Sequence, residues 1–427
     1  MEITVVQSTS SVVLLSLKRW RSHTLVDVAL NVGFAVSGVT IARLLGTITQ
    51  IMLARMMGVA DFGLYTMLYT LLGIVIIVTG LGLDTWLLRQ GGNVNTLDTA
   101  ISQVFSLRFL ATTTLMLISM PIILMTNQAE ITALLVLLVA ISLTCELLLT
   151  TGYNALRAQL RNQKSTLLQI GVAVCIPLSI WMLWSNNQGS VLAAVSSRLI
   201  ANLFGLSLLI WLLRRHLRLI WKPLQLFQII KHTRIFFASD ILANITLKAD
   251  LTLVTFFMGA LAAGIYSPAL MMINTTFLIP GVLWQVLLPI ITRQTVEAHQ
   301  FRRIFGLALL FSVIYGVICA GIFWFTAEQI VYLVYGIQYQ ESSKLIQIMS
   351  SIPLLKSINF CWAMLMVASD RQMLRTKLQA IGATVNIFGN FLLIPLFGLI
   401  AAAWINVGTE LVLLLCYSYG AWATLRR

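Results

Sequence analysis

Charged residues are scarce in this sequence, and acidic residues are the scarcest. Only 10% of the 427 residues are charged, with 14 Asp and Glu against 28 Lys and Arg, whereas 59% are hydrophobic and the mean hydropathy is +0.92. Soluble domains are about 45 to 50% apolar, so no soluble fold of this length has enough interior to bury the excess. The composition therefore excludes an ordinary soluble domain and indicates an integral membrane protein.

Motifs of soluble enzymes and metalloproteins are also missing. The five cysteines lack the short spacings of a disulfide framework or a zinc site. No Gly-Lys pair occurs, which excludes the phosphate-binding loop of a built-in ATPase. We expect no cofactor, no metal and no catalytic residue. The enzyme alternative is a membrane glycosyltransferase or polymerase, but the predicted outward connections, such as 259–262 and 397–398, are too short to hold a second substrate.

Apolar segments of about 20 residues recur from Val26 to Ala423, and each is long enough to cross a hydrocarbon layer of roughly 30 Å as a helix. Continuous apolar runs at 71–78 and 206–213 lack the alternation of membrane-spanning strands. We predict an all-α membrane protein with about 12 transmembrane helices. The predicted helices are 26–53, 62–83, 102–125, 131–156, 166–184, 190–213, 236–258, 263–291, 305–325, 343–367, 376–396 and 399–423.

The basic residues predict the orientation of these helices. Most of the 28 Lys and Arg, Arg108 among them, fall in alternate connections or in the two tails, and only Arg55 and Lys344 fall in the opposite connections. The positive-inside rule therefore predicts that both termini lie in the cytoplasm. The basic excess reflects topology, so we expect no nucleic-acid partner. Residues 1–25 lack the basic start of a signal peptide and are expected to form a cytoplasmic tail.

An internal repeat divides the chain. Met57-Gly58, followed by Gly63-Leu64-Tyr65, has the same pattern as Met258-Gly259, followed by Gly264-Ile265-Tyr266. In both copies the glycines are predicted to form a tight outer turn between the first two helices of a lobe. We predict two lobes of six helices with the same orientation, 26–213 and 236–427, joined by an amphipathic cytoplasmic linker at 214–235.

Polar residues inside the predicted helices point to a site between the lobes. A charge at the bilayer centre costs about 2.5 to 3.5 kcal/mol, so it normally faces an interior or a watery cavity. Along the seventh helix, Asp240, Asn244 and Lys248 lie on one face at spacings of four residues. The other polar residues predicted at membrane depth are Arg43, Gln50, Arg198, Lys356, Asn386, Asn390 and Asn406.

Four cations at this depth (Arg43, Arg198, Lys248 and Lys356) suggest an anionic passenger, and a diphosphate is the obvious candidate. The alternative is that they form structural ion pairs, for instance Lys248 with Glu410 or Arg43 with Asp250. The acids Asp240, Asp250, Glu146 and Glu410 are candidates for ion or proton coupling. Asp84, near the inner end of the second helix, is expected to be a solvated end-cap.

The order of several short motifs resembles that of Wzx-type polysaccharide and O-antigen flippases, in the MATE/oligosaccharidyl-lipid/polysaccharide (MOP) exporter superfamily. The motifs that carry the resemblance are Arg43-Leu44-Leu45-Gly46, Leu53-Ala54-Arg55-Met56-Met57-Gly58, Phe62-Gly63-Leu64-Tyr65, Lys248-Ala249-Asp250, Gly264-Ile265-Tyr266-Ser267, Tyr335-Gly336 with Tyr339, Asp370-Arg371-Gln372, and Ile394-Pro395-Leu396-Phe397-Gly398-Leu399. The family pattern more often has Arg where this chain has Lys248, which puts bidentate phosphate binding there in doubt.

The resemblance implies a MATE-like, V-shaped fold that flips an undecaprenyl-diphosphate-linked oligosaccharide from the cytoplasmic to the periplasmic leaflet by alternating access. It also implies contact with membrane lipids and, as partners, a polysaccharide polymerase and chain-length machinery; we expect a monomer. The two extra helices of lipid II flippases are missing. The alternative function is that of a multidrug antiporter of the same superfamily. The cavities of those antiporters favour acidic residues, which suit cationic drugs, whereas this chain has four cations at membrane depth.

Overall fold

The computed structural model describes residues 25–90, 94–124, 131–186, 190–214, 216–217, 223–291, 298–369 and 371–425, and within these ranges it contains helices and no strand. The predicted all-α membrane class is therefore confirmed. The helices are α2 (Leu25–Gly80), α3 (Leu83–Gln90), α4 (Val94–Leu124), α5 (Ala133–Ala158), α6 (Asn162–Asn186), α7 (Val191–Leu213), α8 (Pro223–Thr275), α9 (Leu278–Ile291), α10 (Ala298–Val334), the 3-10 turn η1 (Ile337–Tyr339), α11 (Gln340–Met349), α12 (Ile352–Ala368) and α13 (Gln372–Leu425).

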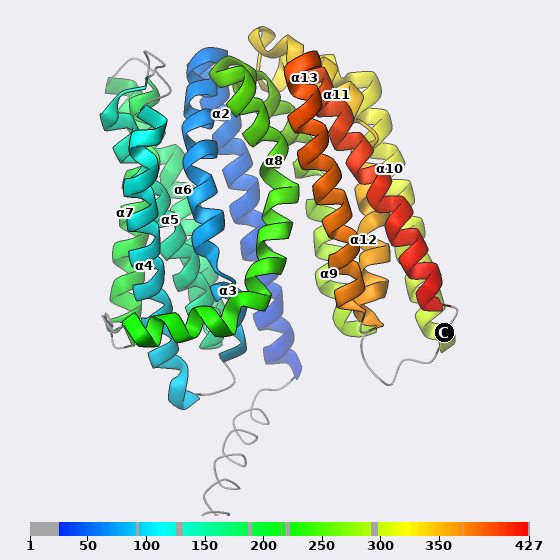
Figure 1. The fold of residues 1–427 in the computed structure, drawn as a ribbon, viewed down its shortest axis with the longest axis horizontal. Helices are drawn as coiled ribbons and strands as arrows, with labels where there is room; N and C mark the ends of the chain where they lie inside the picture. The colour runs from blue at the N-terminus through cyan, green and yellow to red at the C-terminus, as the bar shows by residue number, and fades with distance from the viewer. Residues whose placement is uncertain are drawn as a thin grey trace, which may run out of the picture.

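Three of these helices are broken at a glycine. Gly58 in α2, Gly259 in α8 and Gly398 in α13 have φ angles of 79°, 79° and 64°, in the left-handed region that L side chains rarely adopt. Each break lets the chain fold back, so each of the three helices has two arms (Figure 1). The predicted turns at Gly58 and Gly259 are confirmed, and Gly398 forms the third.

The spans agree with the predicted architecture. Within the described ranges, 8 helices are long and apolar enough to cross a membrane, and α11 with α12, bent by 45°, makes up to 9. Because α2, α8 and α13 each count once in that number although each has two arms, the structure is compatible with the predicted twelve spans.

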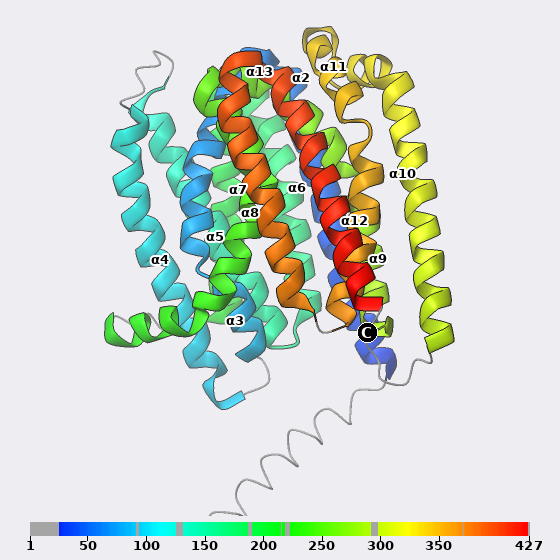
Figure 2. The same ribbon diagram turned by 45° about the vertical axis from the view of Figure 1, so that its right-hand side comes forward.

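The arms of the three broken helices define two ends of the molecule. All three helices fold back at one end, which we call the bend end, whereas α2 begins and α13 finishes at the opposite end (Figures 1 and 2). Helices α2–α7 form the first half and α8–α13 the second half, and α2 packs along α8. α8 begins at Pro223, inside the segment predicted as a linker, and its first turns lie across the opposite end beneath the first half. The predicted tail before Leu25 lies outside the described residues.

The two halves meet at the bend end through the repeated glycines. A methyl group added at Gly63 would collide with the Ala260 carbonyl, and one added at Gly264 would collide with the Val59 carbonyl and the Gly63 backbone. The two copies of the repeat therefore touch each other backbone to backbone. Around them, Leu53, Phe62, Tyr266 and Tyr339 belong to one buried apolar cluster drawn from both halves, and the Tyr339 hydroxyl donates to the Ala54 carbonyl at 2.8 Å.

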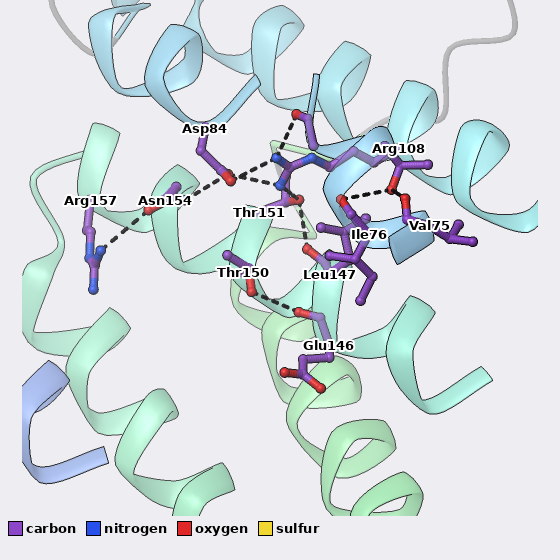
Figure 3. A network of polar contacts seen from close by, with 12 residues as sticks. Val75, Ile76, Asp84, Arg108, Glu146, Leu147, Thr150, Thr151, Asn154 and Arg157 are labelled. Atoms are coloured by element: carbon purple, nitrogen blue, oxygen red, sulfur yellow. Dashed lines mark hydrogen bonds and ion pairs between the residues drawn. The ribbon is translucent and has the colours of Figure 1, made fainter. Parts of the chain in front are cut away.

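A buried ion pair holds the other end of the first half. Arg108 of α4 is only 1% exposed at its side chain, and it donates to both carboxylate oxygens of Asp84 in α3 at 2.9 and 2.8 Å (Figure 3). The guanidinium also donates to the Thr151 hydroxyl at 2.6 Å and to the Gly80 carbonyl at 3.2 Å, while Asn154 donates to Asp84 at 2.7 Å. The prediction of Asp84 as a solvated cap and of Arg108 as a loop cation was wrong, because both lie where α3, α4 and α5 pack together.

Candidate functional site

A cavity of about 1090 Å³ lies between the two halves. It is bounded by residues of α2, α7, α8, α9, α12 and α13, so both halves contribute to its wall. Its basic lining residues are Arg43, Arg198, Lys248, Lys356 and Arg375, and Glu410 is its one acidic lining residue among the described positions. The cavity therefore has an excess of positive charge, and it holds all four cations that the sequence predicts at membrane depth.

Arg198 on α7 is held by three partners within the first half. Its guanidinium donates to Glu146 of α5 at 2.8 Å and to the Tyr65 hydroxyl at 3.0 Å, and it lies 4.3 Å from the centre of the Tyr69 ring. The Glu146 side chain is 42% exposed, against 20% for Arg198. Glu146 therefore orients the arginine from a position where water can also reach the carboxylate.

Lys356 on α12 has the equivalent arrangement in the second half. Its ammonium pairs with Glu410 of α13 and lies 5.6 Å from the centre of the Phe277 ring. The Asn359 amide donates to the other carboxylate oxygen of Glu410 at 2.9 Å. Each half thus presents one cation to the cavity, backed by an acid of its own half and by an aromatic ring.

Arg43 and Lys248 differ from that pair. Both line the cavity and are exposed, and neither forms an ion pair with any residue in the described part of the chain. The alternative pairs considered from the sequence, Lys248 with Glu410 and Arg43 with Asp250, are not formed. Glu410 instead pairs with Lys356. Asp250 lies on the side of α8 opposite Lys248, as their separation of two residues requires.

Asp250 is 3% exposed and has no cationic partner among the described residues. It accepts from the Asn406 amide at 2.9 Å, the Tyr266 hydroxyl at 3.2 Å and the Leu251 backbone N–H at 2.8 Å. It therefore belongs to a buried polar cluster between α8 and α13, beside the cavity and not on its wall.

The remaining predicted polar residues fall in different places. Gln50 lines the cavity with Arg43. Asn386 and Asn390 are 1% and 0% exposed, and the Asn390 amide donates to the Asn386 carbonyl at 2.8 Å, so they pack inside the second half. Asn244 is half-buried. The side chain of Asp240 lies outside the described part of the structure.

The sequence prediction missed Arg375, which was counted with the cytoplasmic connections. α13 begins at Gln372, earlier than predicted, so Arg375 is already in the first turn of that helix and faces the cavity with Gln379. Their spacing of four residues places both on one helix face and was the available signal. Trp284 and Tyr417 line the same part of the cavity.

The chain matches one protein family and is similar in structure to several solved membrane transporters. Residues 52–344 match the family described as polysaccharide biosynthesis protein, whereas no curated protein sequence matches. Among similar solved structures are the lipid II flippase MurJ in an inward closed conformation (14% identity, 90% of this chain and 87% of that chain, TM-score 0.74) and an inward-facing multidrug resistance MATE family transporter of the MOP superfamily (12%, 92% and 99%, 0.72). A third is a MOP superfamily transporter from Pyrococcus furiosus (11%, 94% and 94%, 0.60), for which reversed polarity of the binding pocket is taken to suggest a different function.

These identities are low, so the solved structures define the fold alone. The family match is broader, because it covers more than half of the chain and includes the repeated turn of each half. This chain is therefore a multi-pass membrane protein with the fold of the MATE transporters and MurJ, and it belongs to the polysaccharide biosynthesis protein family.

Proposed function

We propose that this protein flips an undecaprenyl-diphosphate-linked oligosaccharide from the cytoplasmic to the periplasmic leaflet of a bacterial inner membrane, for the synthesis of a surface polysaccharide. The observation that carries the proposal is the pair Arg43 and Lys248, which face a cavity between the two halves without an acidic partner among the described residues. Uncompensated cations in a cavity are costly unless water or an anionic ligand reaches them. A diphosphate is an anion with the oxygens that Arg and Lys bind best.

The paired cations have a second role in this proposal. Arg198 and Lys356 are each held by a carboxylate, and a phosphate oxygen that approaches them competes with Glu146 or Glu410 for the same hydrogen bonds. The released carboxylate then has no cationic partner. Glu146 and Glu410 are therefore candidates for coupling substrate binding to an ion or a proton, and the buried Asp250 is a further candidate.

The contacts between the halves support the proposal of alternating access. The bend end is closed by the Gly63–Gly264 contact and by the apolar cluster around it. The cavity extends from there toward the opposite end, since Tyr417 and Arg375 lie about 28 and 34 Å along α13 from Gly398 at roughly 1.5 Å per residue. With both termini cytoplasmic, as the basic residues predict, this state accepts substrate from the cytoplasm. Release to the periplasm requires the repeated glycines to separate.

The polarity of the cavity argues against the drug-antiporter alternative. A cationic drug would meet five basic side chains and one acid that is already paired. For the Pyrococcus furiosus transporter, reversed polarity of the binding pocket is taken to suggest a different function. That comparison supports the use of cavity charge as an indicator of substrate charge among proteins of this fold. We further propose that the protein acts as a monomer beside a polysaccharide polymerase and chain-length machinery.

The test is flipping of a fluorescent undecaprenyl-diphosphate disaccharide by the full-length protein in liposomes. Changing Arg43→Ala or Lys248→Ala should each slow flipping about tenfold or more, because a hydrogen bond to a charged group contributes about 1.5 to 3 kcal/mol. Arg55→Ala is the matched control, since Arg55 is exposed on the same helix as Arg43 and does not line the cavity. Unchanged rates in both cavity variants, or efflux of cationic dyes driven by protons, would refute the proposal.

A further inference from the structure

Arg375 has surroundings unlike those of the other cavity cations. Its guanidinium carbon lies 5.4 Å from the centre of the Trp284 ring, and Tyr417 lines the same cavity. No acidic residue in the described part of the chain pairs with it, and its Nε has no hydrogen-bond partner there. It is therefore a cation that lies against an aromatic ring without an acidic partner among the described residues.

Arg375 also lies far from the other uncompensated cations along the cavity. At roughly 1.5 Å per residue, Lys248 lies about 16 Å from Gly259, Arg43 about 22 Å from Gly58, and Arg375 about 34 Å from Gly398. The three helices that contain these glycines fold back at the same end of the molecule (Figure 1). From the helical rise, Arg375 is therefore about 12 Å nearer the opposite end than Arg43. That separation exceeds the length of one diphosphate, whose charges Arg43 and Lys248 already balance.

We propose that Arg375, Trp284, Tyr417 and Gln379 form a second subsite, which binds the carboxylate of an acidic sugar in the glycan. The inference rests on the proposed function, because it takes the diphosphate to lie at Arg43 and Lys248 and the glycan to extend toward Arg375. It makes the protein selective for glycans that carry a uronic acid near the lipid.

The chemistry of the four residues fits a sugar acid. A guanidinium binds a carboxylate through two parallel hydrogen bonds, and stacking on an aromatic face holds it in the plane that this geometry needs. Gln379 offers both a donor and an acceptor, and Tyr417 offers a hydroxyl, which suits the hydroxyl groups of a sugar ring. The ring of Phe360, 6.1 Å from Trp284 between centroids, extends the aromatic wall beside them.

The experiment uses two undecaprenyl-diphosphate disaccharides that differ only in the second sugar, glucuronic acid in one and glucose in the other. Initial flipping rates are measured with the full-length protein in liposomes. The wild-type protein should flip the glucuronic acid lipid about tenfold faster than the glucose lipid at limiting concentration, and Arg375→Ala should slow the glucuronic acid lipid about tenfold more than the glucose lipid, so that the preference is lost. Lys377→Ala, an exposed cation two residues away that does not line the cavity, should leave both rates unchanged.

The outcomes separate the two proposals. If the wild-type protein flips both lipids at the same rate, the subsite is refuted and the proposed function stands. If Arg375→Ala slows both lipids equally, Arg375 serves the diphosphate or the fold, and the subsite is again refuted. If the wild-type protein flips neither lipid, the proposed function fails and the subsite with it. Arg375→Lys keeps the positive charge without the planar guanidinium, so it should retain only part of the preference for the glucuronic acid lipid. Its flipping activity also shows that a substitution at this position allows the protein to fold.

Discussion

Replacing Asp84 with Ala should destabilise the protein more than replacing Arg108 with Met, although the two residues form one ion pair. The reason is their unequal exposure, 32% for the Asp84 side chain and 1% for that of Arg108. In Asp84→Ala the guanidinium stays buried with only the Thr151 hydroxyl and the Gly80 carbonyl as acceptors. In Arg108→Met the carboxylate keeps the Asn154 amide and gains water.

The magnitudes follow from the cost of an unpaired buried charge. Removing one partner of a buried ion pair costs about 3 to 5 kcal/mol, so Asp84→Ala should fall in that range. Arg108→Met should cost about 1 to 3 kcal/mol, because it removes hydrogen bonds but leaves no fully buried charge. The double variant removes both charges and should be more stable than Asp84→Ala alone, which requires a coupling energy larger than the loss of about 1 to 3 kcal/mol expected for Arg108→Met.

The assay is reversible unfolding of the full-length protein in mixed micelles, with a double-mutant cycle over Asp84 and Arg108. Asp98→Ala is the matched control in the same half, because Asp98 pairs with His216 at the surface with side chains 57% and 27% exposed. Such a surface pair contributes about 0 to 1 kcal/mol. The reasoning is refuted if Arg108→Met loses more unfolding free energy than Asp84→Ala, or if the two losses add in the double variant. Either result would show that burial of the guanidinium does not determine the stability of the pair.

Three further predictions concern the closed end and the acids. Gly264→Val should abolish flipping, because its side chain would keep the two halves apart at the bend end, whereas Gly171→Val, where an added methyl meets no neighbour, should flip normally in the same liposome assay. Glu410→Gln should lower the thermal unfolding midpoint by leaving Lys356 without its carboxylate, and changing Lys356→Met in the same chain should recover most of that loss. Asp250→Asn should fold, because the remaining amide oxygen can still accept from Asn406 and Tyr266 and only the hydrogen bond from the Leu251 N–H is lost, but it should make the flipping rate insensitive to an imposed ion or proton gradient.

Much of the fold is predictable from the sequence because the bilayer allows few solutions. Long apolar runs must become helices, since no other open segment satisfies its backbone in lipid. The turns at Gly58 and Gly259 are predictable from the repeat, because both positions combine a φ of 79° with an extended ψ, a conformation essentially restricted to glycine. The direct contact between the two repeat copies is not predictable, because it depends on how the halves pack and not on the spacing within either one.

Only part of the candidate site is predictable from the sequence. The cost of a charge in lipid places Arg198 and Lys356 in an interior, but it does not choose their partners, because several acids lie at comparable depth along other helices. The pairs with Glu146 and Glu410 depend on the rotation of each helix about its axis. Arg375 was missed for a different reason: its helix begins before the apolar run does, and hydropathy alone does not mark that start.

The distribution of the ion pairs bears on how the halves separate. Among the described residues, three of the four ion pairs join helices of one half, namely Arg108 with Asp84, Arg198 with Glu146, and Lys356 with Glu410, and the fourth joins Asp98 of α4 to His216 in the connection that follows α7. An ion pair between the halves would have to be broken in every cycle, and a buried pair costs about 3 to 5 kcal/mol to break. The bend end is instead joined by glycine backbone, apolar side chains and the hydrogen bond from the Tyr339 hydroxyl to the Ala54 carbonyl. Such a contact excludes water from the closed end, yet its separation leaves these four ion pairs intact.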